Sequence, residues 1–383
     1  MGLFDEFKKK GARKITEPEI LVGSNSPVCP EEAFVEQDGR TCYFYLRRFP
    51  DTQEQTISSC FVCNMLDQSH VIPIAEWKKD PSGPPMLPYD QVTHDPDGLT
   101  LDADELEIVW TMEGSGAGLL YKGELLAFLP EWASHENFPG YSRYIKGETP
   151  FGWGMTQAKE HLDAVIRAGR DFWAKMEGDF WPGFQDSQIN TLETFFGKHE
   201  QYFAIDGGRF PPRALVTGEK NGVKYGITLG MSLLRQPMVE SFYQERTADF
   251  SRSELGFACT KEQEAIFMPV LQQIADAASL PWNRITSLGH GHTIPLDGVE
   301  GFPAMWLLND NLLTPGDSPR YEDAFGERVN LLWLVPVTQE EYSFLLEFDM
   351  EKVFALRLPG EMTIFDGNAK VPLECLKELT KRP

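Results

Sequence analysis

The sequence has no long apolar run, few cysteines and far fewer cations than anions. No stretch reaches the roughly 18 consecutive apolar residues that a membrane-spanning helix needs, so we expect no transmembrane segment. The first ten residues also lack the apolar core of a secretory signal peptide. We therefore expect a protein of the cytoplasm that does not bind membranes.

The six cysteines are too sparse in 383 residues for a disulfide framework. Cys60 and Cys63 have the Cys-x-x-Cys spacing of redox and zinc sites, but they lie in a strand-like run, residues 59–63. In a strand, an odd offset points the two sulfurs to opposite faces. We interpret the cysteines as free thiols, which are typical of a reducing compartment.

Cations are outnumbered, with 35 Lys and Arg against 58 Asp and Glu and a formal net charge of −23. Nucleic-acid binding needs clustered cations, so this charge argues against a nucleic-acid partner. It favours a basic protein partner, which an acidic surface would attract at low salt. An alternative is that the acidity serves solubility alone.

The length and the 42% of apolar residues are typical of a globular protein with two domains. Strand-like and helical segments are mixed without a regular βαβ rhythm, which favours an α+β fold. We expect two mixed domains, each a largely antiparallel or mixed sheet with packed helices. The Gly- and Pro-rich segments around residues 180–212 place the boundary near residue 188, giving domains 1–188 and 189–383.

Apolar periodicity predicts the main elements. Residues 20–40 are rich in Pro, Ser and Asn and predict a loop. Strands are expected at residues 41–49, 59–66, 106–110, 125–129 (after a Lys122-Gly123 turn), 214–217, 223–229, 302–308 and 329–337. Helices are expected after Thr156, near residues 192–199, along residues 266–278, after Thr338 and after Pro372. Capping boxes are expected at Thr260 with Gln263 and at Thr338 with Glu341, and a type I′ turn at Asn221-Gly222.

A glycine-rich segment, residues 114–118, follows the strand expected at residues 106–110. It differs from the dinucleotide-binding fingerprint because its third glycine comes one residue early, and it lacks the Gly-Lys-Ser/Thr of a P-loop. The segment that follows predicts a strand, not a helix whose N-terminus would bind phosphate. We interpret residues 114–118 as a flexible connection between strands.

Two histidines give the sharpest chemical candidate. His290 and His292 lie two residues apart in a Gly-His-Gly-His-Thr segment, so in extended chain both imidazoles would share a face. A metal site needs at least one more ligand; Asp297, Glu300, Asp310 and distant histidines are available, and spacing alone selects none of them. The alternative is a loop whose histidines bind backbone groups or line an interface, and we expect no metal.

A second candidate is the turn that follows the strand expected at residues 223–229. Arg235 and Glu240 are candidates for a buried ion pair or for contacts with a partner, and neither forms a catalytic set with its neighbours.

Three segments resemble the suppressor-of-fused (SUFU) domain family and occur in the same order as in that family. They are residues 227–240, residues 288–304 with the Gly-His-Gly-His-Thr segment, and residues 329–342. The first half is similar to the amino-terminal part that accompanies this domain in bacterial members, at residues 113–118, 140–143 and 147–150.

The resemblance implies a protein-binding function. Animal members are non-enzymatic regulators that hold a transcription factor in the cytoplasm and clasp an extended peptide between two domains, partly by strand addition. Bacterial members are similar to immunity proteins proposed to neutralise secreted toxins, many of them nucleases. The family supplies no catalytic residue and no cofactor. The long acidic insert of the animal proteins has no counterpart here, so Hedgehog-type signalling does not follow.

We therefore expect a non-enzymatic bacterial immunity or sequestering factor whose protein partner is a basic toxin, such as a nuclease, or a regulator. The partner is expected in a cleft between the domains, where pockets commonly form. The residues expected to contact it are Arg235, Gln236, Glu240, His290 and His292. The alternatives are a metal-dependent enzyme that uses His290 and His292, and a stress or scaffold protein without a dedicated partner. Nothing in the sequence indicates an oligomeric state.

Overall fold

The computed structural model describes residues 17–79, 81, 83–348 and 357–380. The first ten residues, on which the expectation about a signal peptide rests, lie outside this part. The chain divides into two compact units, Met1–Phe172 and Trp173–Pro383. Sheets of antiparallel and parallel pairs with packed helices form the described parts of both units, which confirms the α+β fold class. Helix α3 (Trp181–Phe196) runs through residue 188, and the domain boundary expected there stays a prediction.

The first unit contains two sheets. One is antiparallel, with its strands in the order β1 (Glu19–Asn25), β2 (Glu31–Gln37), β3 (Thr41–Arg48) and β4 (Thr56–Asn64). The other is mixed, in the order β5 (Leu106–Trp110), β6 (Ala117–Tyr121), β7 (Glu124–Leu129), β8 (Tyr141–Ser142), β10 (Gly152–Gly154) and β9 (Glu148–Thr149). A short helix, α1 (Ile74–Trp77), lies in the connection between the sheets.

The loop expected at residues 20–40 is wrong, because this stretch forms β1 and β2. In β2 the buried positions are Glu31, Ala33 and Val35, so a charged residue occupies one place in the apolar alternation. Arg48 on the neighbouring strand pairs with the buried Glu31 carboxylate. Such pairing is what allows a charged group inside a protein, and it hides the strand pattern from a reading of polarity alone.

Helix α2 (Lys159–Met176) packs on the second sheet through Leu162 and Ile166. The helix comes so close to the sheet that a Cβ on Gly118 would lie 2.3 Å from Ile166 Cδ1, and one on Gly169 would lie 2.3 Å from the Trp110 carbonyl oxygen. The segment 114–118 therefore supplies a close helix–sheet contact. It connects β5 to β6 as expected, and its residues are buried.

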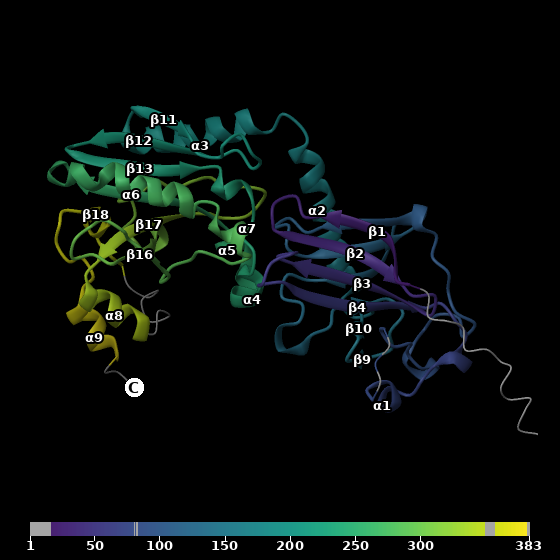
Figure 1. The fold of residues 1–383 in the computed structure, drawn as a ribbon. Helices are drawn as coiled ribbons and strands as arrows, with labels where there is room; N and C mark the ends of the chain where they lie inside the picture. The colour runs from purple at the N-terminus through teal and green to yellow at the C-terminus, as the bar shows by residue number, and fades with distance from the viewer. Residues whose placement is uncertain (1–16, 80, 82, 349–356, 381–383) are drawn as a thin grey trace, which may run out of the picture. The chain divides into compact units, whose positions relative to one another are not determined.

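The second unit is built on one mixed sheet (Figure 1). The strand order is β11 (Gln201–Ala204), β12 (Ala214–Lys220), β13 (Val223–Leu229), β14 (Arg252–Thr260), β17 (Val329–Val337), β16 (Ala304–Asn309) and β15 (Thr293–Pro295). The pairs of β14 with β17 and with β18 (Ile364–Phe365) are parallel, and the other pairs are antiparallel. Every residue of β16 and β17 is buried, as their continuous apolar sequences predict.

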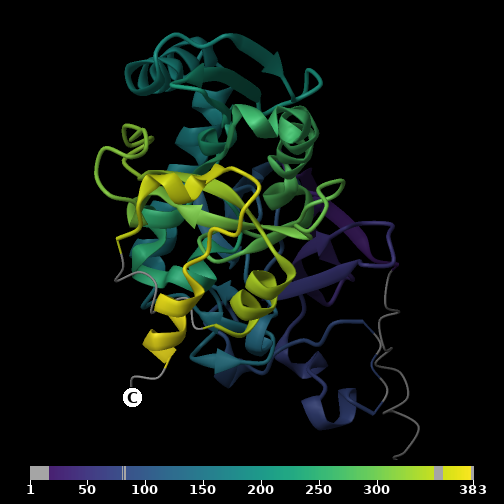
Figure 2. The ribbon, with the colours of Figure 1, turned by 90° about the vertical axis from the view of Figure 1, so that its left-hand side faces the viewer.

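Helices cover both faces of this sheet. Leu271 of α6 (Glu264–Ala277) faces Gly226 of β13, whereas Leu192 of α3 packs in the core with Tyr225 and Ile227. Because neighbouring residues of a strand point to opposite faces, α3 and α6 lie on opposite sides of the sheet. The remaining helices are α4 (Val239–Tyr243), α5 (Thr247–Phe250), α7 (Leu280–Arg284), α8 (Gln339–Glu347) and α9 (Leu373–Thr380). Figure 2 shows the same arrangement turned by 90°.

The turn and helix signals had mixed outcomes. Asn221 and Gly222 both have positive φ, at 54° and 79°, as the predicted type I′ turn between β12 and β13 requires. The capping box of Thr338 with Glu341 is confirmed, but the one expected at Thr260 is wrong. The chain after Thr260 begins with a 3₁₀ turn, Lys261–Gln263, and Thr260 makes no side-chain cap to it. Within the described residues, no helix is both long and apolar enough to span a membrane.

Candidate functional site

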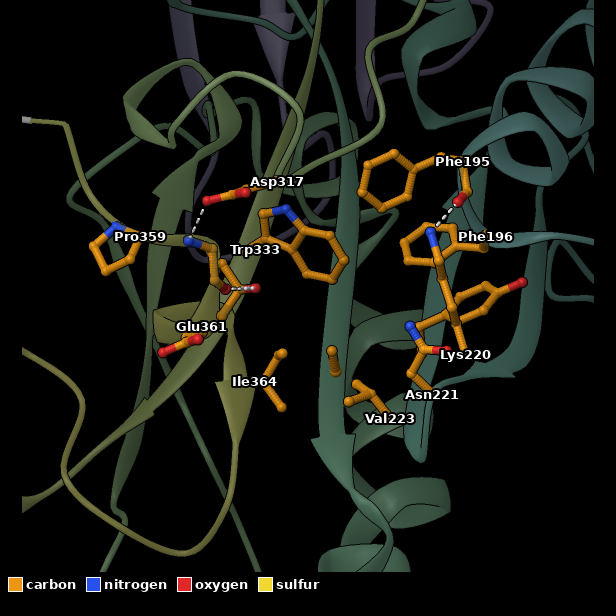
Figure 3. Close-up of a pocket in the computed structure, with 14 residues that line it drawn as sticks. Phe195, Phe196, Lys220, Asn221, Val223, Asp317, Trp333, Pro359, Glu361 and Ile364 are labelled. Carbon is orange, nitrogen blue, oxygen red and sulfur yellow. Dashed lines mark hydrogen bonds between the residues drawn. The ribbon is translucent and has the colours of Figure 1, made fainter.

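The α3 side of the sheet in the second unit is hollowed by an open groove of about 490 Å³. Its floor consists of residues on β13, β14 and β17, namely Tyr225, Ala258 and Trp333. One wall is formed by the end of α3 and the β12–β13 turn, and the other by residues 359–364 with Asp317 (Figure 3). We call this feature the aromatic groove.

Aromatic contacts fix the floor of the aromatic groove. Phe196 stacks on Tyr225 with ring centroids 3.9 Å apart, and the Trp333 indole Nε1 donates to Ser318 Oγ at 3.0 Å. Burial, followed by the charges of two glutamates, raises the pKa of Tyr225 to about 12, so its hydroxyl stays neutral at ordinary pH. The floor is therefore uncharged and its rings are buried, so the accessible aromatic surface of the groove is that of the half-buried Phe195 and Phe196.

The two walls carry opposite charges. Lys220 lies on the α3 side, where its ammonium group is 4.5 Å from the centre of the Phe195 ring and donates to the Phe195 carbonyl oxygen. Asp317 and Glu361 lie on the other side, and both are exposed. Asp317 Oδ2 accepts from the Gly360 backbone N–H at 2.8 Å, and this hydrogen bond holds Asp317 next to the segment that carries Glu361. The groove is thus apolar at its base and acidic along one rim.

A fully buried carboxylate, Glu254, holds the turn that follows β13. Its Oε1 accepts from the backbone N–H groups of Gly230 and Ser232 at 3.0 and 2.9 Å and from Ser232 Oγ at 2.6 Å. Its Oε2 accepts from Thr228 Oγ1 at 2.7 Å. Burial is the main cause that raises the pKa of Glu254 to about 7, and these hydrogen bonds oppose the rise.

A second buried carboxylate, Glu327, places Arg235. Its Oε1 accepts from Arg235 Nε at 2.6 Å, and its Oε2 accepts from Arg252 Nε at 2.7 Å. Arg252 is fully buried and also donates from Nη1 to the carbonyl oxygens of Ser232 and Leu233, at 3.1 and 2.6 Å. The half-buried Arg235 is therefore in an ion pair with the buried carboxylate of Glu327 and not with the nearby Glu240.

The structure brings the two predicted partner-binding segments together. The buried side chain of Gln236 donates to the Leu288 carbonyl oxygen at 3.1 Å and accepts from the Leu288 N–H at 2.8 Å. Gln236 thereby joins the turn to the start of the histidine segment. Glu240, on α4, is exposed beside Phe242, whose exposed fraction is 66%. The role of these segments in binding a partner stays a prediction.

The two histidines lie in different environments. His290 is buried, its ring centroid is 5.5 Å from that of Trp306, and its Nδ1 accepts from the Asn309 N–H at 3.3 Å. Burial lowers the pKa of His290 to about 3, so the imidazole is neutral. His292 is exposed, and its Nδ1 accepts from the Gly289 N–H at 3.3 Å.

A metal-dependent reaction has no support in this arrangement. In the part of the chain that the structure describes, no group of three or more His, Cys, Asp or Glu side chains is placed to hold a metal ion. Cys60 and Cys63 lie in β4 as expected and are fully buried free thiols, and burial alone raises the pKa of Cys60 far above its usual range. A thiol in this state is a poor metal ligand and a poor nucleophile.

The second unit thus carries an open groove on a mixed sheet, together with buried ion pairs and hydrogen bonds that hold its turns. Residues 204–368 match the family model described as Suppressor of fused protein (SUFU). These residues therefore carry the suppressor-of-fused domain that the motifs predict, and the family of this domain is one of binding and regulatory proteins. Comparisons with curated proteins and with solved structures gave no match. Apart from Phe195 and Phe196, the residues that line the aromatic groove lie within the matched region.

Sequence reasoning missed the aromatic groove. Its lining residues come from segments spread between residues 195 and 364, and most of them have the polarity of ordinary strand or loop residues. The only local signal was the pair of adjacent aromatics, Phe195 and Phe196, just before the glycine that ends α3.

Proposed function

We propose that this chain is a non-enzymatic protein of the bacterial cytoplasm that binds a basic protein and neutralises or sequesters it. A toxin such as a nuclease is the candidate partner, and the chain would then act as its immunity factor. The observation that carries this proposal is the aromatic groove with its acidic rim, in a domain of a protein-binding family.

The chemistry of the aromatic groove suits a Lys- or Arg-containing segment. The long alkyl stem of such a residue packs on aromatic rings, and its charged end is attracted both by a ring face and by carboxylates. The half-buried Phe195 and Phe196 supply the rings, and Asp317 and Glu361 supply the carboxylates. The net charge of −23 would add long-range attraction and a fast encounter with a basic partner.

The cysteines support the proposed compartment. All six are free, and five of them are buried. Free buried thiols are typical of proteins that fold under reducing conditions, as in the cytoplasm.

The proposal is tested by capture of partners from a lysate of the source organism, with the tagged full chain at low salt. We expect one basic protein in stoichiometric amount, released at high salt, because electrostatic attraction between exposed charges is screened by ions. Co-production of that protein with the chain should abolish its toxicity to cells. Absence of a stoichiometric basic partner would contradict the proposal.

Matched variants locate the site. Glu361→Lys reverses a charge on the groove rim, and Glu374→Lys makes the same change on α9, where the side chain is 95% exposed. We expect Glu361→Lys to lose the partner and Glu374→Lys to retain it. Glu240→Lys tests the alternative surface on α4 in the same assay. Loss with Glu240→Lys and not with Glu361→Lys would move the site to α4.

A further inference from the structure

A second hollow of the second unit, of about 500 Å³, is lined by arginines although the chain as a whole is acidic. Its lining residues are Arg246, Arg320, Arg328 and Arg357, with Asn311 and Leu312. We call this feature the four-arginine pocket. None of the described residues that line it is an acid, in a sequence where Asp and Glu outnumber Lys and Arg by 58 to 35.

Tertiary contacts of the backbone place these arginines. The N–H of Arg328, just before β17, donates to the Ala248 carbonyl oxygen at 3.0 Å, which brings it near the segment of Arg246. The N–H of Leu358 donates to the Leu312 carbonyl oxygen at 2.8 Å, which brings Arg357 to the same place. The pocket is therefore a product of the folded sheet, assembled from four separate segments.

The positive charge of the four-arginine pocket exceeds what its neighbours neutralise. Behind it, the buried Asp310 pairs with Arg320, and its other oxygen lies 3.8 Å from Arg328. Arg357 donates to a neutral acceptor, the Asn311 carbonyl oxygen. Arg246 lies 3.3 Å from Asp249, and both of these side chains are exposed. In the described part of the chain, one buried carboxylate and one exposed carboxylate thus pair with the guanidinium groups of the pocket.

The positive charges of neighbouring arginines in the pocket repel one another. Burial first, and then the charges of Arg328 and Arg357, lower the pKa of Arg320. A bound anion would offset this repulsion, and it would meet several planar guanidinium groups, whose paired N–H donors match the oxygens of phosphate.

The shape and lining narrow the class of ligand. The volume lies in the range of pockets that hold small organic molecules. Among the residues that the structure describes, the lining contains no aromatic side chain on which a nucleobase would stack. We propose that the four-arginine pocket binds a compact polyanion that carries more than one phosphate group and no aromatic base. This site is distinct from the aromatic groove, with which it shares no lining residue.

Titration calorimetry of the full chain with inorganic tripolyphosphate tests the proposal. The variants are Arg246→Gln and Arg357→Gln, because neither side chain pairs with the buried Asp310 and both are exposed. Each should weaken binding by about tenfold or more, since a charge-assisted hydrogen bond contributes about that much. Arg357→Lys keeps the positive charge but loses the paired N–H donors of the planar guanidinium group, so it should also weaken binding.

Arg209→Gln is the matched control, since Arg209 is an exposed arginine of the same unit outside the pocket. It should bind tripolyphosphate as the unaltered chain does. A saturable one-to-one isotherm that only the pocket variants weaken supports the proposal. Absence of saturable binding, an equal loss in Arg209→Gln, or equally tight binding of a hexaglutamate peptide would overturn it.

Discussion

Replacing Glu254 by glutamine tests whether this buried carboxyl group titrates inside the fold. In the structure it is fully buried and accepts four hydrogen bonds from the turn after β13. Glutamine has nearly the same shape and keeps the carbonyl oxygen for the acceptor role of Oε1, but it does not ionise. The substitution therefore removes the titration with little change in packing.

The pKa of Glu254 sets how much this group contributes to the free energy of unfolding as the pH changes. Burial raises the pKa of Glu254 from 4.5 to about 7, so the folded state binds this proton more tightly than the unfolded state. Its stabilising contribution is fully present below the unfolded pKa of 4.5 and is lost as the pH rises through about 7. At about 1.4 kcal/mol per pH unit, the whole contribution is about 3 kcal/mol.

The assay is chemical unfolding of the full chain, followed by tryptophan fluorescence at a series of pH values. Between about pH 5 and pH 8, the free energy of unfolding of Glu254→Gln relative to the unaltered chain should rise by about 2–3 kcal/mol. Glu31, in the first unit, also has a pKa raised to about 7, but it is present in both proteins and cancels in the difference.

Glu374→Gln is the matched control, because it removes one exposed carboxylate from the same unit. Its unfolding free energy relative to the unaltered chain should change little over this pH range. If the difference for Glu254→Gln is constant between these pH values, or falls as the pH rises, the account of a buried titrating carboxyl group is refuted.

Two further predictions concern packing and charge. Gly118→Ala should destabilise the first unit by about 1–3 kcal/mol, because the added methyl group would meet Ile166 of α2. Gly183→Ala, in α3 with open space around it, should be neutral or slightly stabilising. Equal effects of the two substitutions in thermal unfolding would contradict the close helix–sheet contact. Glu327→Gln should cost about 3–5 kcal/mol because it leaves the charge of the fully buried Arg252 without its carboxylate. The exposed Glu322→Gln should cost little in the same urea titration, and a similar cost for both would contradict the buried pair.

Local sequence signals predicted the elements in which burial and polarity agree. The alternating and continuous apolar runs that became β3, β5, β13, β16 and β17 are of this kind, since most of their buried positions carry apolar side chains. The turn at Asn221-Gly222 was predictable because only a few residue types accept two successive positive φ angles.

The sequence predictions failed where contacts between distant segments determine the local structure. Strand β2 was missed because Glu31 occupies a buried position and depends on Arg48, which local sequence does not reveal. The start of α3 was missed because Trp181-Pro182-Gly183 predicts a break, although proline is well tolerated in the first turn of a helix. Arg235, a candidate for a buried ion pair or for contacts with a partner, pairs with Glu327, which is distant in sequence.

Neither hollow was predictable from motifs. The aromatic groove and the four-arginine pocket each draw on segments that the sheet brings together, and no local spacing marks them. The histidine segment drew attention because its spacing is conspicuous, yet His290 packs against Trp306 in the interior. Spacing indicates which side chains share a face, but the fold decides whether that face meets solvent.

The most direct test of the proposed function is the affinity of the captured basic partner for the unaltered chain and for two groove variants, measured by calorimetry at low salt. Phe195→Ala and Glu361→Lys should each weaken binding by about tenfold or more, as substitutions at the centre of an interface commonly do. Glu374→Lys should leave the affinity within about twofold, because an exposed charge outside an interface contributes little. Equal affinities for the unaltered chain and both groove variants would contradict the claim that the aromatic groove binds the partner.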